Sequence, residues 1–328
     1  MGYKTIDGLM RHLRNNGIKI GGSTQKRQLI NTGYFHGYKG YRFFKNSNKP
    51  IPFSTYGDIH ATIKYDSDLK ALFYGKLMFI ETAVKNIALS RIMLDANSEN
   101  IQEMLKKVVA GYNSFPSGTD ETTRKKAQKS KLNLENRIQS SILKAYNNEN
   151  PQITHFYNSM GNSDVPLWAL FEILTLGDFA NLLSCLNFQT RDNITTDLGM
   201  KVTSIDSNRE LIYRYLYILK DLRNAVAHNA VIFDTRFRRF DPSKAMKKCL
   251  QQEFGLSRPV NFQTIDDYVV LICYYLKILK VSKTEIRAFL REFERITDNY
   301  TRTVKPVVSG IVIAPSLSDK IAALKISI

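Results

Sequence analysis

Apolar side chains recur every three to five positions along most of this chain, which is close to the spacing on one face of an α-helix. The longest run of this kind extends from about Asp58 to Leu94. A second run covers residues 208–229, and its apolar stripe consists of Leu211, Tyr215, Ile218, Leu222 and Val226. Both runs predict amphipathic helices, and the pattern as a whole predicts a mainly α-helical fold.

Local start and stop signals predict further elements. Thr5 is placed to cap a helix that stops at Gly17, and residues 33–57, rich in Gly and aromatic side chains, predict loops, turns or a short hairpin. Residues 164–186 are almost entirely apolar, so most of this segment, including Trp168, is expected in the core. Other helices are expected at residues 124–146, 264–280 and 283–297, whereas the tail from residue 304 onward has no clear pattern.

The charge of the chain changes this picture of an ordinary helical protein. Its 328 residues include 47 Lys and Arg but only 30 Asp and Glu, which gives a formal net charge of +17. A charge of this size favours a polyanionic partner, of which nucleic acid is the commonest. A basic surface that serves solubility, or an anionic membrane surface, would explain the same composition.

Other sequence features narrow the class of protein. No uninterrupted apolar run reaches the roughly 18 residues that a membrane span needs, and the first residues contain no apolar secretory signal. Cys185, Cys249 and Cys273 are far apart and fit neither a disulfide framework nor a metal-ligand pattern. We therefore expect a cytoplasmic protein without a metal or other cofactor and without a membrane partner.

One short stretch carries candidate chemistry. Residues 220–233 read KDLRNAVAHNAVIF, with Arg223, Asn224 and His228 among small apolar side chains. Residues four apart share a helix face, so Asn224 and His228 lie together. Arg223 and His228 are five apart, which separates them by about 140° around the helix. The long Arg223 side chain can still bend toward a common site, especially if a second protein surface closes over it.

These residue types suit the cleavage of RNA. A histidine, with a reference pKa near 6.5, can accept or donate a proton near neutral pH. An arginine can hold a phosphate with two hydrogen bonds and stabilise charge on a pentacovalent phosphorus. The 2′-hydroxyl of RNA is an internal nucleophile, so no metal is required. The alternative is a structural role. A solvated helix end, with Arg223 paired to Asp221 or Glu210, would have the same sequence.

The chain resembles a known family at four places. Arg223 to His228 match the Arg-Asn-x-x-x-His signature of HEPN ribonucleases. Residues 69–92, LKALFYGKLMFIETAVKNIALSRI, resemble the long helix of the Abi-2 (AbiD/AbiF-like) abortive infection proteins of the HEPN superfamily, with Glu81 at their acidic position. The segments VPLWALFEILTLGDFANLL and GYFHGYKGYRFF stand where those proteins have a Pro-Leu-Trp segment and a Tyr-rich segment. Together the four stretches cover roughly residues 5–235.

The resemblance implies a fold, a site and partners. The fold is a HEPN-type helical bundle with an additional N-terminal segment and C-terminal helices, divided into residues 1–56, 57–235 and 236–328. Two copies form a homodimer, or an assembly bridged by RNA, in which two motifs face one cleft. The implied activity is a metal-independent endoribonuclease that leaves a 2′,3′-cyclic phosphate. A small structured noncoding RNA restrains this toxin in defence against phage, as in a toxin–antitoxin pair.

Each site residue has a proposed role and a structural alternative. His228 is the general acid or base, Arg223 grips the scissile phosphate, and Asn224 orients His228 or the phosphate. The alternatives are an ion pair for Arg223 and a capped helix turn for Asn224. Glu81 either holds Arg223 or His228 by a hydrogen bond or forms a buried salt bridge.

RNA is also expected to contact basic and aromatic side chains outside the motif. Basic side chains attract the phosphates of RNA, and unpaired bases stack on aromatic side chains. A solvated basic face or a local core would explain the same residues. The candidates are Tyr38, Lys39, Tyr41 and Arg42, then Arg124, Lys125, Lys126, Lys129 and Lys131, and finally Arg236, Arg238, Arg239, Lys244, Lys247 and Lys248.

Two other functions fit the sequence. The first is an RNA-binding HEPN protein or sensor whose Arg-Asn-x-x-x-His motif builds an interface and cuts nothing. The second is a DNA-binding regulator, although the sequence has no convincing helix-turn-helix signature.

Overall fold

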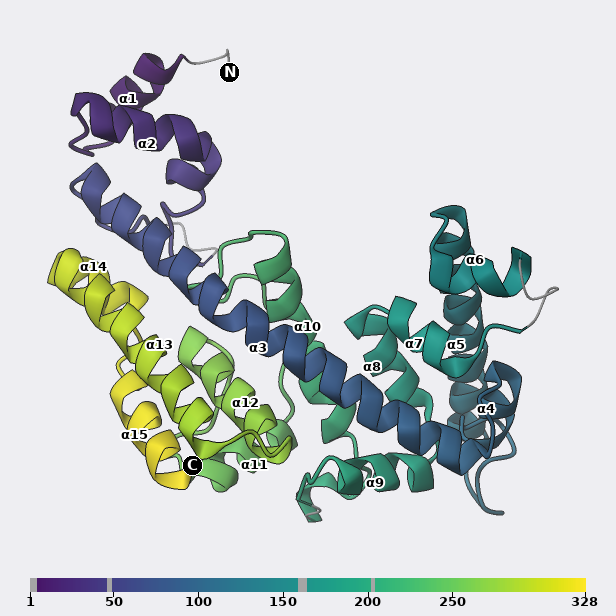
Figure 1. Cartoon of the computed structure of the whole chain (residues 1–328). Coiled ribbons are helices and arrows are strands. Elements are labelled where there is room, and N and C mark those ends of the chain that lie inside the picture. Colours follow the sequence, from purple (N-terminus) through teal and green to yellow (C-terminus); the bar gives the residue numbers. More distant parts are fainter. Residues whose placement is uncertain (1–4, 46–48, 159–163, 202–203) are drawn as a thin grey trace. The chain divides into compact units, whose positions relative to one another are not determined.

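The computed structural model describes residues 5–45, 49–158, 164–201 and 204–328. The described residues are mainly α-helical, as predicted, and their β interactions are isolated bridges such as Lys19 with Thr55 and Phe43 with Pro50. The chain divides into two compact units, residues 1–77 with 221–328 (unit 1) and residues 78–220 (unit 2). Helices α3 (Tyr56–Ala96) and α10 (Leu211–Ala227), which Figure 1 labels, each contribute residues to both units. The three-part division inferred from the resemblance stays a prediction.

Unit 1 combines both ends of the chain. Its N-terminal part contains α1 and α2, and its C-terminal part contains five helices that follow α10. The Thr5 hydroxyl accepts a hydrogen bond from the Gly8 amide and so caps α1, as predicted. The bounds are α1 Ile6–Asn15, α2 Gly22–Tyr34, α3 Tyr56–Ala96, α10 Leu211–Ala227, α11 Lys244–Phe254, α12 Ile265–Ile278, α13 Lys283–Thr303, α14 Pro306–Val312 and α15 Leu317–Ser327.

The first half of α3 packs on α13 through aromatic side chains. Tyr65 stacks on Tyr300 with ring centroids 4.5 Å apart, and Phe73 stacks on Phe293 at 6.4 Å. Both α3 residues are fully buried, and at a spacing of four residues they form one apolar stripe with the equally buried Leu69 and Leu77. Burying such a stripe stabilises a helix far more than intrinsic propensity does, which explains why 41 residues remain helical without a break.

The tail forms two helices although its sequence shows no clear apolar period. The reason lies at Lys320, which is 7% exposed and whose ammonium contacts the carboxylates of Asp266 at 2.6 Å and Asp267 at 2.5 Å. A charged residue therefore occupies a core position of α15, which interrupts the hydrophobic pattern. Among the described residues, no single helix is long and apolar enough to cross a membrane, and only α14 and α15 counted together, with a 55° bend between them, reach that length and composition.

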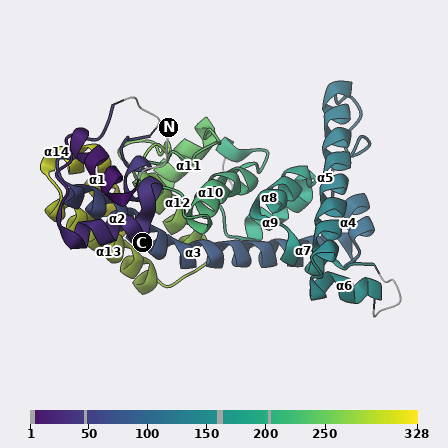
Figure 2. The same cartoon turned by 90° about the horizontal axis from the view of Figure 1, so that it is seen from above.

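Unit 2 contains the remaining helices, and Figure 2 shows them beside the second half of α3. The apolar segment 164–186 divides into two helices at Leu174, because the Thr175 hydroxyl accepts a hydrogen bond from the Asp178 amide at 3.2 Å and starts a new helix. The bounds are α4 Ile101–Lys107, α5 Glu121–Asn147, α6 Pro151–Asn158, α7 Leu167–Ile173, α8 Leu176–Cys185 and α9 Phe188–Asp197.

The expectation that Trp168 lies in the core is wrong. Its neighbours Leu167, Ala169 and Leu170 are fully buried, whereas Trp168 is 44% exposed. Helix α7 buries one face only, and Trp168 lies on the opposite one. A run of apolar residues in the sequence therefore does not show which of its positions faces solvent.

Candidate functional site

The candidate motif lies where α10 ends. Helix α10 stops at Ala227, and Asn229 has a positive φ of 51°. The Ala230 amide donates to the Ala225 carbonyl at 2.8 Å, and the Asn229 amide donates to the Val226 carbonyl at 3.2 Å. These two bonds are the Schellman arrangement that closes a helix, with His228 as the last half-helical residue. The backbone around His228 is therefore fixed by its own hydrogen bonds.

The three motif side chains differ in their environment. Arg223 and Asn224 are half-buried, and the Arg223 guanidinium donates to the Asn224 side-chain oxygen at 3.3 Å. His228 is exposed, and within the described part of the chain its imidazole forms no hydrogen bond or ion pair. The prediction that Asn224 and His228 share a helix face agrees with the bond from the His228 amide to the Asn224 carbonyl. The imidazole of His228 is therefore accessible to a ligand, and it lies about one helical turn from the hydrogen-bonded side chains of Arg223 and Asn224.

A buried carboxylate of α3 holds the segment that follows the motif. Asp66 is 0% exposed, and its side chain accepts hydrogen bonds from the amides of Ile232 at 2.7 Å and Phe233 at 2.8 Å. It also accepts the Tyr41 hydroxyl at 2.9 Å and pairs with Lys70 at 2.7 Å. Burial, followed by the Asp66 charge, raises the pKa of the Tyr41 phenol well above its ordinary value, so this hydroxyl stays protonated and donates.

Lys70 connects this carboxylate to the motif helix. Its ammonium donates to the Asn229 side-chain oxygen at 2.9 Å as well as pairing with Asp66. The residue next to His228 is thus held by a side chain of α3. Sequence reasoning missed Asp66 and Lys70. A signal was present, because Asp66 continues the buried stripe of Thr62, Leu69 and Phe73 on α3 and a charge at such a position requires partners.

Glu81 belongs to unit 2, whereas Arg223, Asn224 and His228 belong to unit 1. It is 8% exposed and forms an ion pair with Lys85 at 3.2 Å. The Lys85 ammonium also donates to the Leu174 carbonyl at 2.6 Å, at the break between α7 and α8. The ion pair with Lys85 is the structural alternative for Glu81, a buried salt bridge, and a role of Glu81 toward Arg223 or His228 is a proposal.

The basic residues that follow the motif fall into two groups. Arg236 pairs with Asp234 at 2.6 Å and donates to the carbonyls of Gly40 and Phe43 at 2.7 Å each. Arg238 pairs with Asp241 at 3.0 Å. These two guanidinium groups are therefore already engaged within unit 1. By contrast, Arg239, Lys244 and Lys248 are exposed and Lys247 is half-buried.

The aromatic segment packs against the residues after the motif. Tyr38 and Tyr41 are each 2% exposed, and Tyr41 stacks on Phe233 with ring centroids 5.9 Å apart. A buried ring has no free face for a base, so both residues match the alternative of a local core. Lys39 is exposed, and Arg42 is half-buried over the Tyr38 ring and donates to Asn16 at 3.2 Å.

The basic start of α5 is also divided between structural and exposed side chains. Arg124 donates to the carbonyls of Tyr112, Phe115, Pro116 and Thr119 and so holds the preceding loop. Lys125 pairs with Glu121 at 2.8 Å, and Lys131 is half-buried. Lys126 and Lys129 are exposed, without an ion pair in the described part of the chain.

The positive charge is unevenly distributed between the two units. Unit 2 contains 16 Lys and Arg against 15 Asp and Glu, so its net charge is close to zero. Nearly all of the net charge of +17 therefore belongs to unit 1, which also contains Arg223, Asn224 and His228. Among the described residues, no group of three or more His, Cys, Asp or Glu side chains is placed to hold a metal ion.

Comparisons with known proteins give one match. The model of a family described as Abi-like protein matches residues 27–234, which is more than half of the chain and includes the motif. No curated protein and no solved structure matches the chain.

Proposed function

The chain belongs to the Abi-like protein family, and from this premise we propose that it is an AbiD/AbiF-like abortive infection protein of the HEPN superfamily that cuts RNA without a metal ion. The observation that carries the proposal is the end of α10. There the exposed His228 lies on a backbone fixed by its own hydrogen bonds, one turn from the linked Arg223 and Asn224. An imidazole and a guanidinium that meet at one phosphate are a constellation suited to phosphate transfer.

The proposed reaction is an internal displacement at phosphorus. The RNA 2′-oxygen forms a bond to the adjacent phosphorus while the bond from phosphorus to the 5′-oxygen breaks. The proton of the 2′-hydroxyl passes to a base, and an acid protonates the leaving 5′-oxygen. The products are a 2′,3′-cyclic phosphate and a 5′-hydroxyl. Arg223 stabilises the charge that develops on the phosphate oxygens, and Asn224 holds Arg223 by the hydrogen bond between them.

A second copy of the chain completes the proposed site. One motif offers a single histidine, whereas the reaction needs both a base and an acid. A symmetric dimer places the same patch on both subunits, so two copies of His228 and Arg223 face one phosphate. This arrangement also removes the difficulty that Arg223 and His228 point about 140° apart on one helix.

RNA is the proposed partner as well as the proposed substrate. Unit 1, with its large positive charge, offers Lys39, Arg239, Lys244 and Lys248 as exposed cations for a phosphate backbone. A small structured noncoding RNA bound there restrains the nuclease until infection removes it. The surface leaves out Tyr38 and Tyr41 because both are buried.

The alternative is a non-catalytic RNA-binding protein or sensor. The hydrogen bond from Arg223 to Asn224 and the closing bonds at Asn229 would equally serve a structural helix end. Only a cleavage assay separates these functions, because both include RNA binding.

The test uses the purified chain, a structured RNA and a metal chelator. We expect wild-type protein to cut the RNA and leave 2′,3′-cyclic phosphate ends, and His228→Ala to reduce the rate by at least about 100-fold while retaining RNA affinity. His155→Ala, which removes an exposed histidine of unit 2, is the matched control and should cut normally. If His228→Ala cuts at the wild-type rate, or if wild type cuts only with added metal, the proposed mechanism is wrong.

A further inference from the structure

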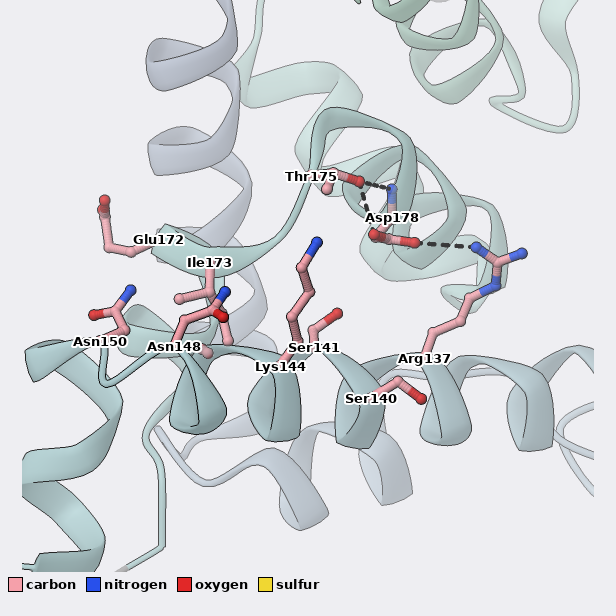
Figure 3. Close-up of a pocket in the computed structure, with 11 residues that line it drawn as sticks. Arg137, Ser140, Ser141, Lys144, Asn148, Asn150, Glu172, Ile173, Thr175 and Asp178 are labelled. Carbon is pink, nitrogen blue, oxygen red and sulfur yellow. Dashed lines mark hydrogen bonds and ion pairs between the residues drawn. The ribbon is translucent and has the colours of Figure 1, made fainter.

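A polar groove runs along α5 in unit 2, and Figure 3 shows one end of it. The groove consists of two adjoining cavities of about 390 and 420 Å³ that share Arg137 and Ser140. Helices α5 and α8 line both cavities, and the ends of α6 and α7 close one of them. The lining residues of α5 and its C-terminal cap extend from Ser130 to Asn148, which corresponds to about 27 Å at the helical rise of 1.5 Å per residue.

Most of the side chains that line the groove end in hydroxyl, amide or charged groups, and Ala145 and Ile173 add apolar surface between them. Hydroxyl and amide groups both donate and accept hydrogen bonds. The Asn181 side-chain oxygen is buried without a hydrogen-bond partner, which is unfavourable unless a ligand or a small side-chain rotation supplies a donor. Ser140, Thr175 and Ser184 already donate their hydroxyl hydrogens within the chain and so offer a ligand acceptor oxygens. Ser141 and Asn148, which also line the groove, can donate as well.

One cation in the groove remains available. The Arg137 guanidinium pairs with Asp178 at 3.0 Å, and the Thr175 hydroxyl donates to the same carboxylate at 2.7 Å. The Lys144 ammonium, in contrast, extends into the groove and has no hydrogen bond or ion pair in the described part of the chain. Glu172 lies at the end of the groove opposite Arg137 (Figure 3). The lining thus contains two cations and two carboxylates, and it favours a ligand with many polar groups that places an anionic group at Lys144.

An aromatic ledge, which we define as Tyr146, Phe156, Tyr157 and Trp168, adjoins this end of the groove. Trp168 precedes Glu172 by four residues and so shares its face of α7. Its ring contacts Phe156 with centroids 5.7 Å apart, and Tyr146 contacts Tyr157 at 5.5 Å. Trp168 is 44% exposed and Tyr157 is 37% exposed, so large ring faces remain open to a ligand.

We propose that the groove and the ledge bind a single-stranded segment of RNA. Unpaired bases stack on aromatic rings, whatever their sequence. The ribose 2′-hydroxyl is both donor and acceptor, which complements a wall of serine and asparagine side chains. Lys144 attracts a phosphate. The length of the groove exceeds one nucleotide, so a strand can reach both Trp168 and the α5–α8 walls whereas a free nucleotide cannot.

This inference rests on the proposed function for the identity of RNA as the partner, but it concerns a different surface. The motif lies in unit 1, and the groove lies entirely in unit 2, whose net charge is close to zero. Binding in the groove depends on stacking and hydrogen bonds, so its affinity should fall only weakly with added salt.

The single tryptophan of the chain makes the test direct. We would titrate the full-length His228→Ala variant, in which the proposed function predicts greatly reduced cutting, with oligouridylate and follow tryptophan emission. We expect saturable quenching by the RNA strand, weaker binding by the deoxy strand, and none by uridine monophosphate or inorganic phosphate. Quenching by the mononucleotide at the same concentration as the strand would overturn the proposal in favour of a nucleotide site.

Substitutions give an independent measurement with labelled RNA. We expect Trp168→Ala to lower the affinity about 5- to 140-fold, which is the range for loss of one stacked base, and Trp168→Phe to retain most of it. Phe79→Ala is the matched control, because Phe79 is also an aromatic residue of unit 2 with 44% exposure. Lys144→Gln should weaken binding, whereas Lys106→Gln, on α4, should not.

The outcomes separate this proposal from the nuclease. If the strand binds without quenching and Trp168→Ala keeps the wild-type affinity, the groove proposal is overturned and cleavage by His228 still stands. If wild type cuts no RNA but quenching and the Trp168 effect appear, the groove proposal is supported and the nuclease is not. If Trp168→Ala changes the oligomeric state and leaves RNA affinity unchanged, the ledge is a protein interface and the proposal is wrong.

Discussion

At the scale of single residues, Asp66 determines how the end of α10 is held. Its carboxylate accepts two backbone amides, one hydroxyl and one ammonium, all from inside unit 1. We predict that Asp66→Asn destabilises the protein by about 2–4 kcal/mol, because the new amide group cannot accept all of these donors and Lys70 loses its counter-charge. Urea denaturation measures the change.

Asp68→Asn is the control for this prediction. Asp68 lies on the same helix but its pair with Lys64 is largely exposed, so its loss should change the free energy of unfolding by less than about 1 kcal/mol. If both substitutions changed the free energy of unfolding equally, water would be able to replace the hydrogen bonds of Asp66, and the prediction would be wrong. Asp66→Asn should also lower the rate of RNA cleavage, because Asp66 holds the segment that follows the motif. The decrease in rate should be at least as large as the decrease in the fraction of folded protein.

At the scale of secondary structure elements, the docking of α15 depends on one buried charge. Burial alone would lower the pKa of Lys320, but the carboxylates of Asp266 and Asp267 raise it above its ordinary value. We predict that Lys320→Met costs about 3–5 kcal/mol, because it leaves two carboxylates buried without a cation. Thermal or urea unfolding of the full chain measures this loss.

The matched control for α15 is Lys325→Met on the same helix. Lys325 pairs with Glu294 at 2.7 Å, but both side chains are substantially exposed, so the expected change is below about 1 kcal/mol. A small effect of Lys320→Met would mean that water reaches the two aspartates, and the buried pair would then not be what fixes α15.

At the scale of the whole molecule, the concentration of charge in unit 1 predicts where salt-sensitive binding occurs. The combined change of Arg239, Lys244 and Lys248 to Gln should lower the slope of log affinity for RNA against log salt by about 2, since each lost phosphate contact removes about 0.7–0.9. Filter binding or anisotropy at several salt concentrations gives the slope. Lys106→Gln removes one exposed charge of unit 2 and should leave the slope unchanged, and a slope unaffected by the triple change would place the RNA elsewhere.

The features that the sequence determined by itself are local ones. The helical period, the Thr5 cap, the shared face of Asn224 and His228 and the net charge all depend on residues within one or two helical turns or on composition alone. The long α3 was predicted within two residues at each end. The helical period and the shared face follow from backbone geometry, the Thr5 cap follows from a hydrogen bond to a residue three positions away, and the net charge follows from composition alone.

The tertiary structure alone decided which side chains are engaged and which are available. Arg236 meets the carbonyls of Gly40 and Phe43, nearly 200 positions away. Asp66 meets the amides of Ile232 and Phe233, and Trp168 faces solvent from an apolar segment. No local pattern encodes such partners, because a buried charge or an exposed ring is defined by residues that only the folded chain brings together.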